Sequence, residues 1–207
     1  MPNAEKIDLY KLNKAEYVTP RQPMLLDIQP ARYLSITGTG RPGDEEFQVK
    51  IGALYATAFT LKFESKFAGR DYAVCKLEGL YSTGPGGPGF PNLSMDQWHW
   101  DLIIRVPDFV EAALLKAARA KLTAKQAPHA ADVGFQTLRE GRCVQMLHVG
   151  PYDREPETIE TMCACAVAAG FEFAGTHHEI YLSDPRRVAP EKLRTILRIP
   201  VRKAKKV

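Results

Sequence analysis

Two stretches of the chain resemble each other, and this internal duplication constrains the fold more than any other feature. The similar pairs are LIIRVP and TILRIP (102–107 and 195–200), LEGLYS and HEIYLS (77–82 and 178–183), and ITGTGRPGDEEF and LHVGPYDREPET (36–47 and 147–158). A duplicated unit predicts two similar halves that meet at a junction, and such junctions are common ligand sites.

Each repeat has the pattern strand, helix, strand, strand. The first repeat is expected to place strands at 32–37, 72–82 and 97–107 and a helix from about Asp44. The second is expected to place strands at 142–148, 173–182 and 194–201 and a helix at 155–169, with Pro156 in its first turn and Gly170 after its end. The predicted class is α+β, a tandem βαββ duplication whose antiparallel sheets carry helices on one face and leave a ligand cleft between the halves.

The whole chain, 1–207, is predicted to form a single domain. The repeats extend over about 30–107 and 140–203, and an alanine-rich helix within about 108–130 connects them. Asp108 and Glu111 have the spacing of a capping box, which would start this helix just after Pro107.

The charge and the apolar pattern exclude several classes of protein. The net charge is +4 and there is no helix-turn-helix pattern, so direct nucleic-acid binding is not expected. No apolar run approaches the roughly 20 residues that span a membrane. The polar N-terminus does not resemble a secretory signal, and the four cysteines have no disulfide-framework spacing, so a cytoplasmic protein is expected.

The segment THHEIYL carries two histidines and a glutamate inside a predicted strand. Alternate residues of a strand share a face, so His177, Glu179 and Tyr181 should point one way and His178 and Ile180 the other. A metal site, an acid/base site and a polar edge are the three interpretations. One His and one Glu are too few ligands for zinc without a further residue, so no metal is expected.

Glu78 occupies the position of Glu179 when the two motifs are aligned. Two carboxylates across one cleft could hold a cation or divide acid and base roles. The alternative is a pair of equivalent polar residues at the edge of the sheet.

Aromatic residues cluster in the same motifs. They are Tyr55, Tyr81, Trp98, Trp100, Tyr152 and Tyr181. Tyr and Trp walls around a carboxylate suit flat, hydrophobic or cationic molecules. His148 ends a predicted strand that could reach the cleft, although a structural role is the favoured interpretation.

Taken together, the motifs resemble the GyrI-like small-molecule-binding family. The segments that carry the likeness are KLNKAEY (from Lys11), YATAFTLKF (from Tyr55), LEGLY (from Leu77), the WHWDLIIRVPDFV stretch, EGRCVQMLHVGPYDREPET (from Glu140) and HHEIYLSDPRRVAPEKLRTILRIPV (from His177). The resemblance implies a tandem βαββ module that binds a small aromatic or cationic molecule and needs no cofactor.

The family includes gyrase inhibitors, effector-binding domains of multidrug-responsive regulators, and stand-alone members similar to hydrolases of cyclopropanoid genotoxins. The chain resembles the stand-alone branch, in which Glu179 would be the cleft glutamate and Tyr55, Tyr81, Trp100 and Tyr181 the aromatic neighbours. Two departures affect this expectation, because Lys76 replaces a proline and Tyr81-Ser82 replace two tryptophans of many relatives.

The resulting hypothesis is hydrolysis of a strained cyclopropane, with Glu179 activating water and Tyr55 or Tyr181 donating to the developing oxyanion. Trp98, Trp100, Tyr81, Tyr152, Glu78 and His148 are the expected ligand-binding residues. The alternatives are a binding protein that sequesters cationic or aromatic drugs, and an interaction module that inhibits a protein partner such as gyrase.

Overall fold

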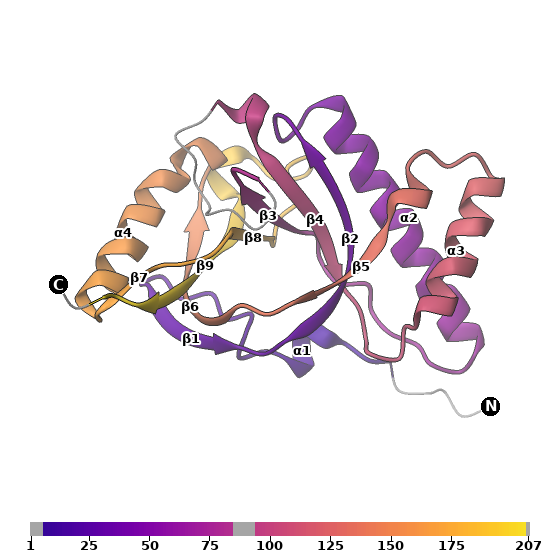
Figure 1. Ribbon diagram of the computed structural model, residues 1–207, viewed down its shortest axis with the longest axis horizontal. Coiled ribbons are helices and arrows are strands. Elements are labelled where there is room, and N and C mark those ends of the chain that lie inside the picture. Colours follow the sequence, from indigo (N-terminus) through magenta and orange to yellow (C-terminus); the bar gives the residue numbers. More distant parts are fainter. Residues whose placement is uncertain (1–5, 85–93, 206–207) are drawn as a thin grey trace.

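The computed structural model describes residues 6–84 and 94–205, and these residues form one large antiparallel sheet with helices (Figure 1). The strand order is β1-β6-β9-β8-β3-β4-β2-β5, and β7 pairs with β9 off this path. The strands are β1 (Met24–Ile28), β2 (Ala31–Thr39), β3 (Glu78–Ser82), β4 (His99–Arg105), β5 (Gly134–Leu138), β6 (Gly141–Val149), β7 (Phe171–Phe173), β8 (His177–Tyr181) and β9 (Arg194–Lys203).

The strand order has the symmetry that a duplication predicts. β3 of the first half pairs with β8 of the second at the centre, and β4 and β9 flank them, followed by β2 and β6. The edge strands are exchanged, because β1 pairs with β6 and β5 pairs with β2. The two halves are therefore joined at the centre of the sheet and again by the exchanged strands.

Four helices accompany the sheet. They are α1 (Leu9–Leu12), α2 (Glu45–Phe67), α3 (Ala112–Ala124) and α4 (Glu155–Ala168). α2 packs on β2 and β4, α4 packs on β6 and β7, and α3 lies against α2 (Figure 1). Strand pairing shows that α2 and α4 cover the same face, so the prediction of helices on one face is confirmed.

The two clusters under the helices make up most of the core, and smaller clusters lie on the opposite face of the sheet. Under α2 the core is built from alternate strand residues such as Leu34, Leu102 and Ile104 together with Leu54 and Leu61 of the helix. A smaller cluster under α4 repeats the arrangement with Val144, Met162, Ala166, Leu197 and Ile199. Side chains two apart on each strand point to the same helix, which is the period that the sequence pattern predicts.

Three expected elements differ from the structure. The strand expected at 72–82 begins only at Glu78, and the strand expected at 173–182 is divided into β7 and β8. The predicted capping box at Asp108 and Glu111 is wrong. The Val110 N–H bonds to the Pro107 carbonyl in a turn, and α3 begins at Ala112, after Glu111, without a side-chain cap. Most of the Gly/Pro loop at 83–92 lies outside the described residues.

Other helix-end predictions are confirmed. Pro156 lies in the first turn of α4, where a missing N–H costs nothing. Gly170 follows the helix with φ +79°, a conformation that glycine adopts readily. No helix among the described residues has the length and apolar character needed to cross a membrane.

The face of the sheet away from α2 and α4 carries a buried polar network beneath the N-terminal segment. Arg198 donates to Glu140, Gln145 and the Glu16 carbonyl, and Arg105 forms an ion pair with Glu16 at 2.7 Å. Each of these charges has a partner of opposite sign or a hydrogen bond, as burial requires.

A carboxylate and tyrosine cluster between the helices

The register of β3 against β8 determines which side chains meet at the centre of the sheet. Gly79 is opposite Glu179, and Tyr81 is opposite His177. These positions lie on the helix-covered face together with Tyr181. The predicted alternation is confirmed, since His178 and Ile180 lie on the other face beside Glu78 and Leu80.

Two tyrosines meet above Gly79. The hydroxyl groups of Tyr81 and Tyr181 are hydrogen-bonded to each other. A Cβ atom at Gly79 would lie 2.9 Å from the Tyr81 ring and 3.0 Å from the Tyr181 hydroxyl, so only glycine leaves room for the pair. Burial, with Glu179 nearby, raises the pKa of both phenols well above the ordinary value, and both therefore remain hydrogen-bond donors at neutral pH.

Three ionisable side chains gather beside this pair. The His177 Nε2 atom is 3.2 Å from Oε1 of Glu179, and both residues come from β8. Glu155, in the first turn of α4, is the third member. One nitrogen or oxygen atom of each residue lies within 4.8 Å of the others, and all three side chains are buried. We call Glu155, His177 and Glu179 the carboxylate cluster.

Glu155 was not predicted from the sequence. Acidic residues are common in the first turn of a helix, where they are usually exposed and complement the helix dipole. Glu155 is instead 4% exposed because α4 starts against the sheet beside β8. The one available signal was its position just after GPYDR, in the segment EGRCVQMLHVGPYDREPET that carries part of the family resemblance.

Glu155 is buried beside a second carboxylate, that of Glu179. Burial raises its pKa well above the usual value, and the charge of Glu179 and a hydrogen bond with Glu179 raise it further. Its Oε1 atom is buried without a hydrogen-bond partner among the described residues.

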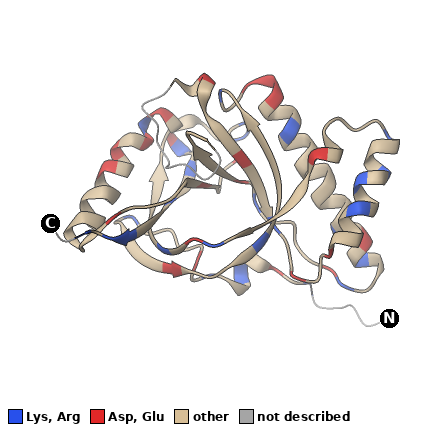
Figure 2. Cartoon of the chain, in the orientation of Figure 1, with Lys and Arg blue, Asp and Glu red and all other residues tan. Residues whose placement is uncertain are grey.

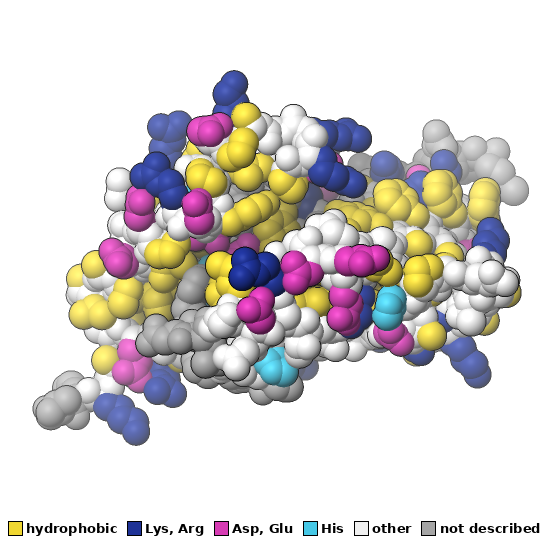
Figure 3. Space-filling model, turned by 90° about the horizontal axis from the view of Figure 1, so that it is seen from above, with side chains coloured by type: hydrophobic (Ala, Val, Ile, Leu, Met, Phe, Trp, Pro, Cys, Tyr) yellow, Lys and Arg dark blue, Asp and Glu magenta, His cyan; other side chains and the backbone are white. Residues whose placement is uncertain are grey.

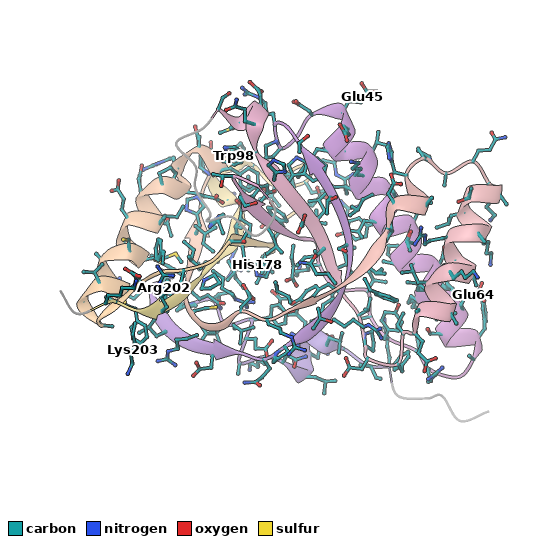
Figure 4. All side chains as sticks on the ribbon, in the orientation of Figure 1. Glu45, Glu64, Trp98, His178, Arg202 and Lys203 are labelled. Carbon is teal, nitrogen blue, oxygen red and sulfur yellow. The ribbon has the colours of Figure 1, made fainter. Side chains whose placement is uncertain are left out.

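Further aromatic residues surround the cluster. The ring of Tyr152 packs edge-on against Tyr181 at 6.1 Å and is 38% exposed, and Trp98 lies 6.0 Å from Tyr81. Tyr55 on α2 is half-buried and forms a hydrogen bond with the Leu77 backbone. Seen from above, Figure 3 shows a hollow near the middle of the molecule with hydrophobic side chains and acidic ones beside them. Figure 4 places Trp98 near the upper end of the central strands.

The expectation that Glu78 faces Glu179 across a cleft is wrong. Glu78 is fully buried on the opposite face, where its carboxylate accepts from Tyr17 and contacts His178 Nε2 at 2.9 Å. In the structure the two repeats align with a shift of one residue from the motif alignment, so that Tyr81 matches Tyr181 and Gly79 matches Glu179. In a strand a shift of one residue moves every side chain to the other face.

Two other candidates lie in the core. Trp100 is 1% exposed and packs over Gly38 and against Phe47, so it supports the wall rather than presenting a face for stacking. His148 contacts the Thr158 hydroxyl at 2.8 Å and the Pro151 carbonyl at 3.1 Å, which fits the structural role favoured from the sequence.

Two βαββ halves joined in one sheet, with a tyrosine-walled acidic cluster between their helices, define a class of small-molecule-binding domain. The family model that matches residues 21–202 is the GyrI-like small molecule binding domain, and the chain belongs to this family.

Solved structures agree with this assignment. An uncharacterized conserved protein from Listeria innocua is 36% identical, with a TM-score of 0.87, and the match covers 95% of this chain and all of that one. A protein described as a hydrolase from the same organism is 35% identical with a TM-score of 0.85 and the same coverage. The C-terminal domain of EcmrR shares the fold at 13% identity, with a TM-score of 0.60 over 88% of this chain and 98% of that domain. No curated protein matches the chain.

Proposed function

We propose that this protein is a cofactor-independent hydrolase of small, flat electrophiles and that Glu179 activates the attacking water. The observation that carries the proposal is the buried Glu179 carboxylate beside the Tyr81–Tyr181 hydroxyl pair on the face between α2 and α4. The similarity to the Listeria innocua protein described as a hydrolase supports a catalytic role for the fold.

The substrate class follows from the surroundings of Glu179. Tyr152 and Trp98 provide apolar surfaces that end in polar atoms, which suits a flat aromatic ring system. The finer proposal is that the substrate is a cyclopropanoid genotoxin, whose strained ring is conjugated to a carbonyl group.

The chemistry requires one base and one donor. Glu179 accepts a proton as the water oxygen bonds to the less hindered cyclopropane carbon. The cyclopropane carbon–carbon bond breaks, and its electron pair moves through the conjugated system to the carbonyl oxygen. Tyr181, hydrogen-bonded to Tyr81, donates a hydrogen bond and then a proton to that oxygen, so the product is a ring-opened alcohol with an enol or phenol. The proton on Glu179 returns to Tyr181 through water.

The test is to incubate the protein with a cyclopropanoid alkylator and analyse the products by mass spectrometry. Wild-type protein is expected to form the water adduct, and Glu179→Gln, which keeps the shape but removes the base, is expected to slow it by about 100-fold or more. Glu157→Gln, on the exposed side of α4, is the matched control and should retain activity. Ring opening at the wild-type rate by Glu179→Gln would overturn the assignment of Glu179.

Sequestration of cationic or aromatic drugs is the second candidate, and the buried Glu179 carboxylate among aromatic side chains favours it. The same experiment separates the two functions, because a binding protein returns the compound intact. An effect on a protein partner such as gyrase would appear without any small ligand.

A further inference from the structure

We propose that Glu155, His177 and Glu179 form a binding site for one Zn²⁺ ion. Two carboxylates and an imidazole are ligands that zinc accepts in three-residue sites, which leave a fourth position open. From the sequence, His177 and Glu179 alone were too few for a metal. The tertiary structure supplies the third residue from α4.

The spacing of the three side chains suits a single ion. Zinc bonds of about 2.0–2.2 Å in a tetrahedron place ligand atoms about 3.3–3.6 Å apart. His177 Nε2 and Glu179 Oε1 are 3.2 Å apart, and the atoms of all three residues lie within 4.8 Å of one another. Small side-chain rotations would therefore bring all three donors to bonding distance.

The buried carboxylates differ in how their charges are compensated. Glu16 pairs with Arg105, Glu140 with Arg198, and Glu78 with His178, each at 2.7–2.9 Å. Among the described residues, Glu155 forms no ion pair with Lys or Arg. The network on one face of the sheet is thus charge-compensated, whereas the carboxylate cluster on the other face has two carboxylates and one imidazole.

The second observation is the Oε1 atom of Glu155. It belongs to a side chain that is 4% exposed and is a member of the cluster, and it has no hydrogen-bond partner in the described part of the chain, whereas the same carboxyl group is hydrogen-bonded to Glu179. Leaving a buried carboxylate oxygen unsatisfied is costly, and coordination to a cation removes that cost.

The surroundings favour a cation in two further ways. The donors come from β8 and from the first turn of α4, two regular elements that hold them in place. The charged residues of α4 are all acidic and lie toward its start, whereas those of α3 are basic (Figure 2). The fourth position would face the Tyr81–Tyr181 pair and could hold water or a ligand oxygen.

The experiment measures Zn²⁺ binding to metal-free full-length protein by isothermal titration calorimetry, with Co²⁺ absorption as a reporter of tetrahedral geometry. Wild type is expected to bind one equivalent, and Glu155→Gln and His177→Ala to bind at least about tenfold more weakly. Circular dichroism checks that both variants are folded, and the near-isosteric Glu155→Gln carries the conclusion if His177→Ala is not.

Two control variants address other zinc ligands on the surface. His129 and Asp132 form an exposed pair at 2.8 Å, and Cys163 is exposed, so His129→Ala and Cys163→Ser should keep the full equivalent. Failure of wild type to bind Zn²⁺, or undiminished binding by Glu155→Gln, would overturn the proposal.

A zinc ion bound to Glu179 would occupy the carboxylate that acts as the base in metal-free protein, so the metal inference and the hydrolase proposal are tested under separate conditions and fail separately. Zinc binding is measured without turnover, and ring opening is measured on metal-free protein. Activity without zinc binding would leave the hydrolase proposal standing and remove the metal site. Zinc binding without activity would leave the metal site standing and remove the hydrolase proposal.

Discussion

Gly79 shows how one residue without a side chain can organise this site. It is the cross-strand neighbour of Glu179, and the rings of Tyr81 and Tyr181 occupy the space that a Cβ atom would need. A glycine in the first repeat thus matches the glutamate of the second, so that of Glu78 and Glu179 only Glu179 lies on this face at the junction of the halves.

Gly79→Ala is predicted to displace the tyrosine pair. The added methyl group would overlap the Tyr81 ring and the Tyr181 hydroxyl, so we expect a loss of about 1–3 kcal/mol in the free energy of unfolding and a larger loss of ligand binding or turnover. Urea denaturation and a ligand-binding or product assay measure the two effects. Gly52→Ala on α2, where a Cβ meets no atom, is the control. Unchanged function in a stable Gly79→Ala protein would contradict the role given to the tyrosine pair.

Two of the three arginines on β9, Arg198 and Arg202, differ in what they contribute to stability. Arg198 is 1% exposed in the middle of the sheet and donates to three partners, among them Glu140 at 2.9 Å. Arg202 lies near the C-terminal end, where it pairs with Glu172 at 2.7 Å while remaining mostly exposed (Figure 4). Distance alone does not separate these pairs, but burial does.

Arg198→Met is predicted to lower the free energy of unfolding by about 3–5 kcal/mol, because it removes the buried guanidinium that donates to Glu140 Oε2 and to the Glu16 carbonyl. Arg202→Met, the matched change on the same strand, is expected to cost about 1 kcal/mol or less. Chemical denaturation of both variants tests the prediction. Equal losses would show that the buried network adds nothing beyond a surface pair.

Over the whole molecule, the buried network makes stability depend on pH. Burial alone would raise the pKa of Glu140, but His178 and Arg198 lower it to about 2. Burial alone would lower the pKa of His178, but Glu140 and Glu78 raise it to about 9. An ionised carboxylate and an imidazolium therefore lie together under the N-terminal segment at neutral pH.

The acid limb of the stability curve is the sharper test. Since the pKa of Glu140 is lower in the folded chain than its usual 4.5, its contribution is complete above that value and is lost as the pH falls toward 2. The loss from this residue is about 3 kcal/mol. The Glu140→Gln variant should be less stable than wild type at about pH 6. The difference in the free energy of unfolding between the two proteins should narrow as the pH falls. A gap that stays constant down to about pH 3 would contradict the low pKa.

Much of the architecture could be predicted from the sequence, because hydrophobic periodicity and repeated motifs are local properties. Two βαββ repeats, helices on one face of the sheet, and the alternation of His177, Glu179 and Tyr181 are all present. The limits of the repeats, at about 30–107 and 140–203, remain a prediction. β1 lies before the first repeat and pairs with β6 of the second.

The residues of the site could be predicted only in part. Glu179, Tyr81, Tyr181, Tyr152 and Trp98 do lie together, and their roles remain proposals. Glu78 was placed on the wrong face because motif similarity tolerates a shift of one residue, whereas strand pairing does not. The sequence could not show whether Trp100 and His148 bind a ligand or are structural residues, since Trp and His side chains also occur in protein cores.

The sequence alone determined the hydrophobic periodicity of the strands and helices, the duplication and the chemical types of the side chains, because these depend on neighbours along the chain. The tertiary structure decided the rest. The pairing of β3 with β8 set Gly79 opposite Glu179 and left one carboxylate of the two on the helix-covered face. The position of α4 buried Glu155 beside that carboxylate, across 24 residues of sequence (179 minus 155). Such meetings depend on register and packing between distant segments, and no local pattern encodes them.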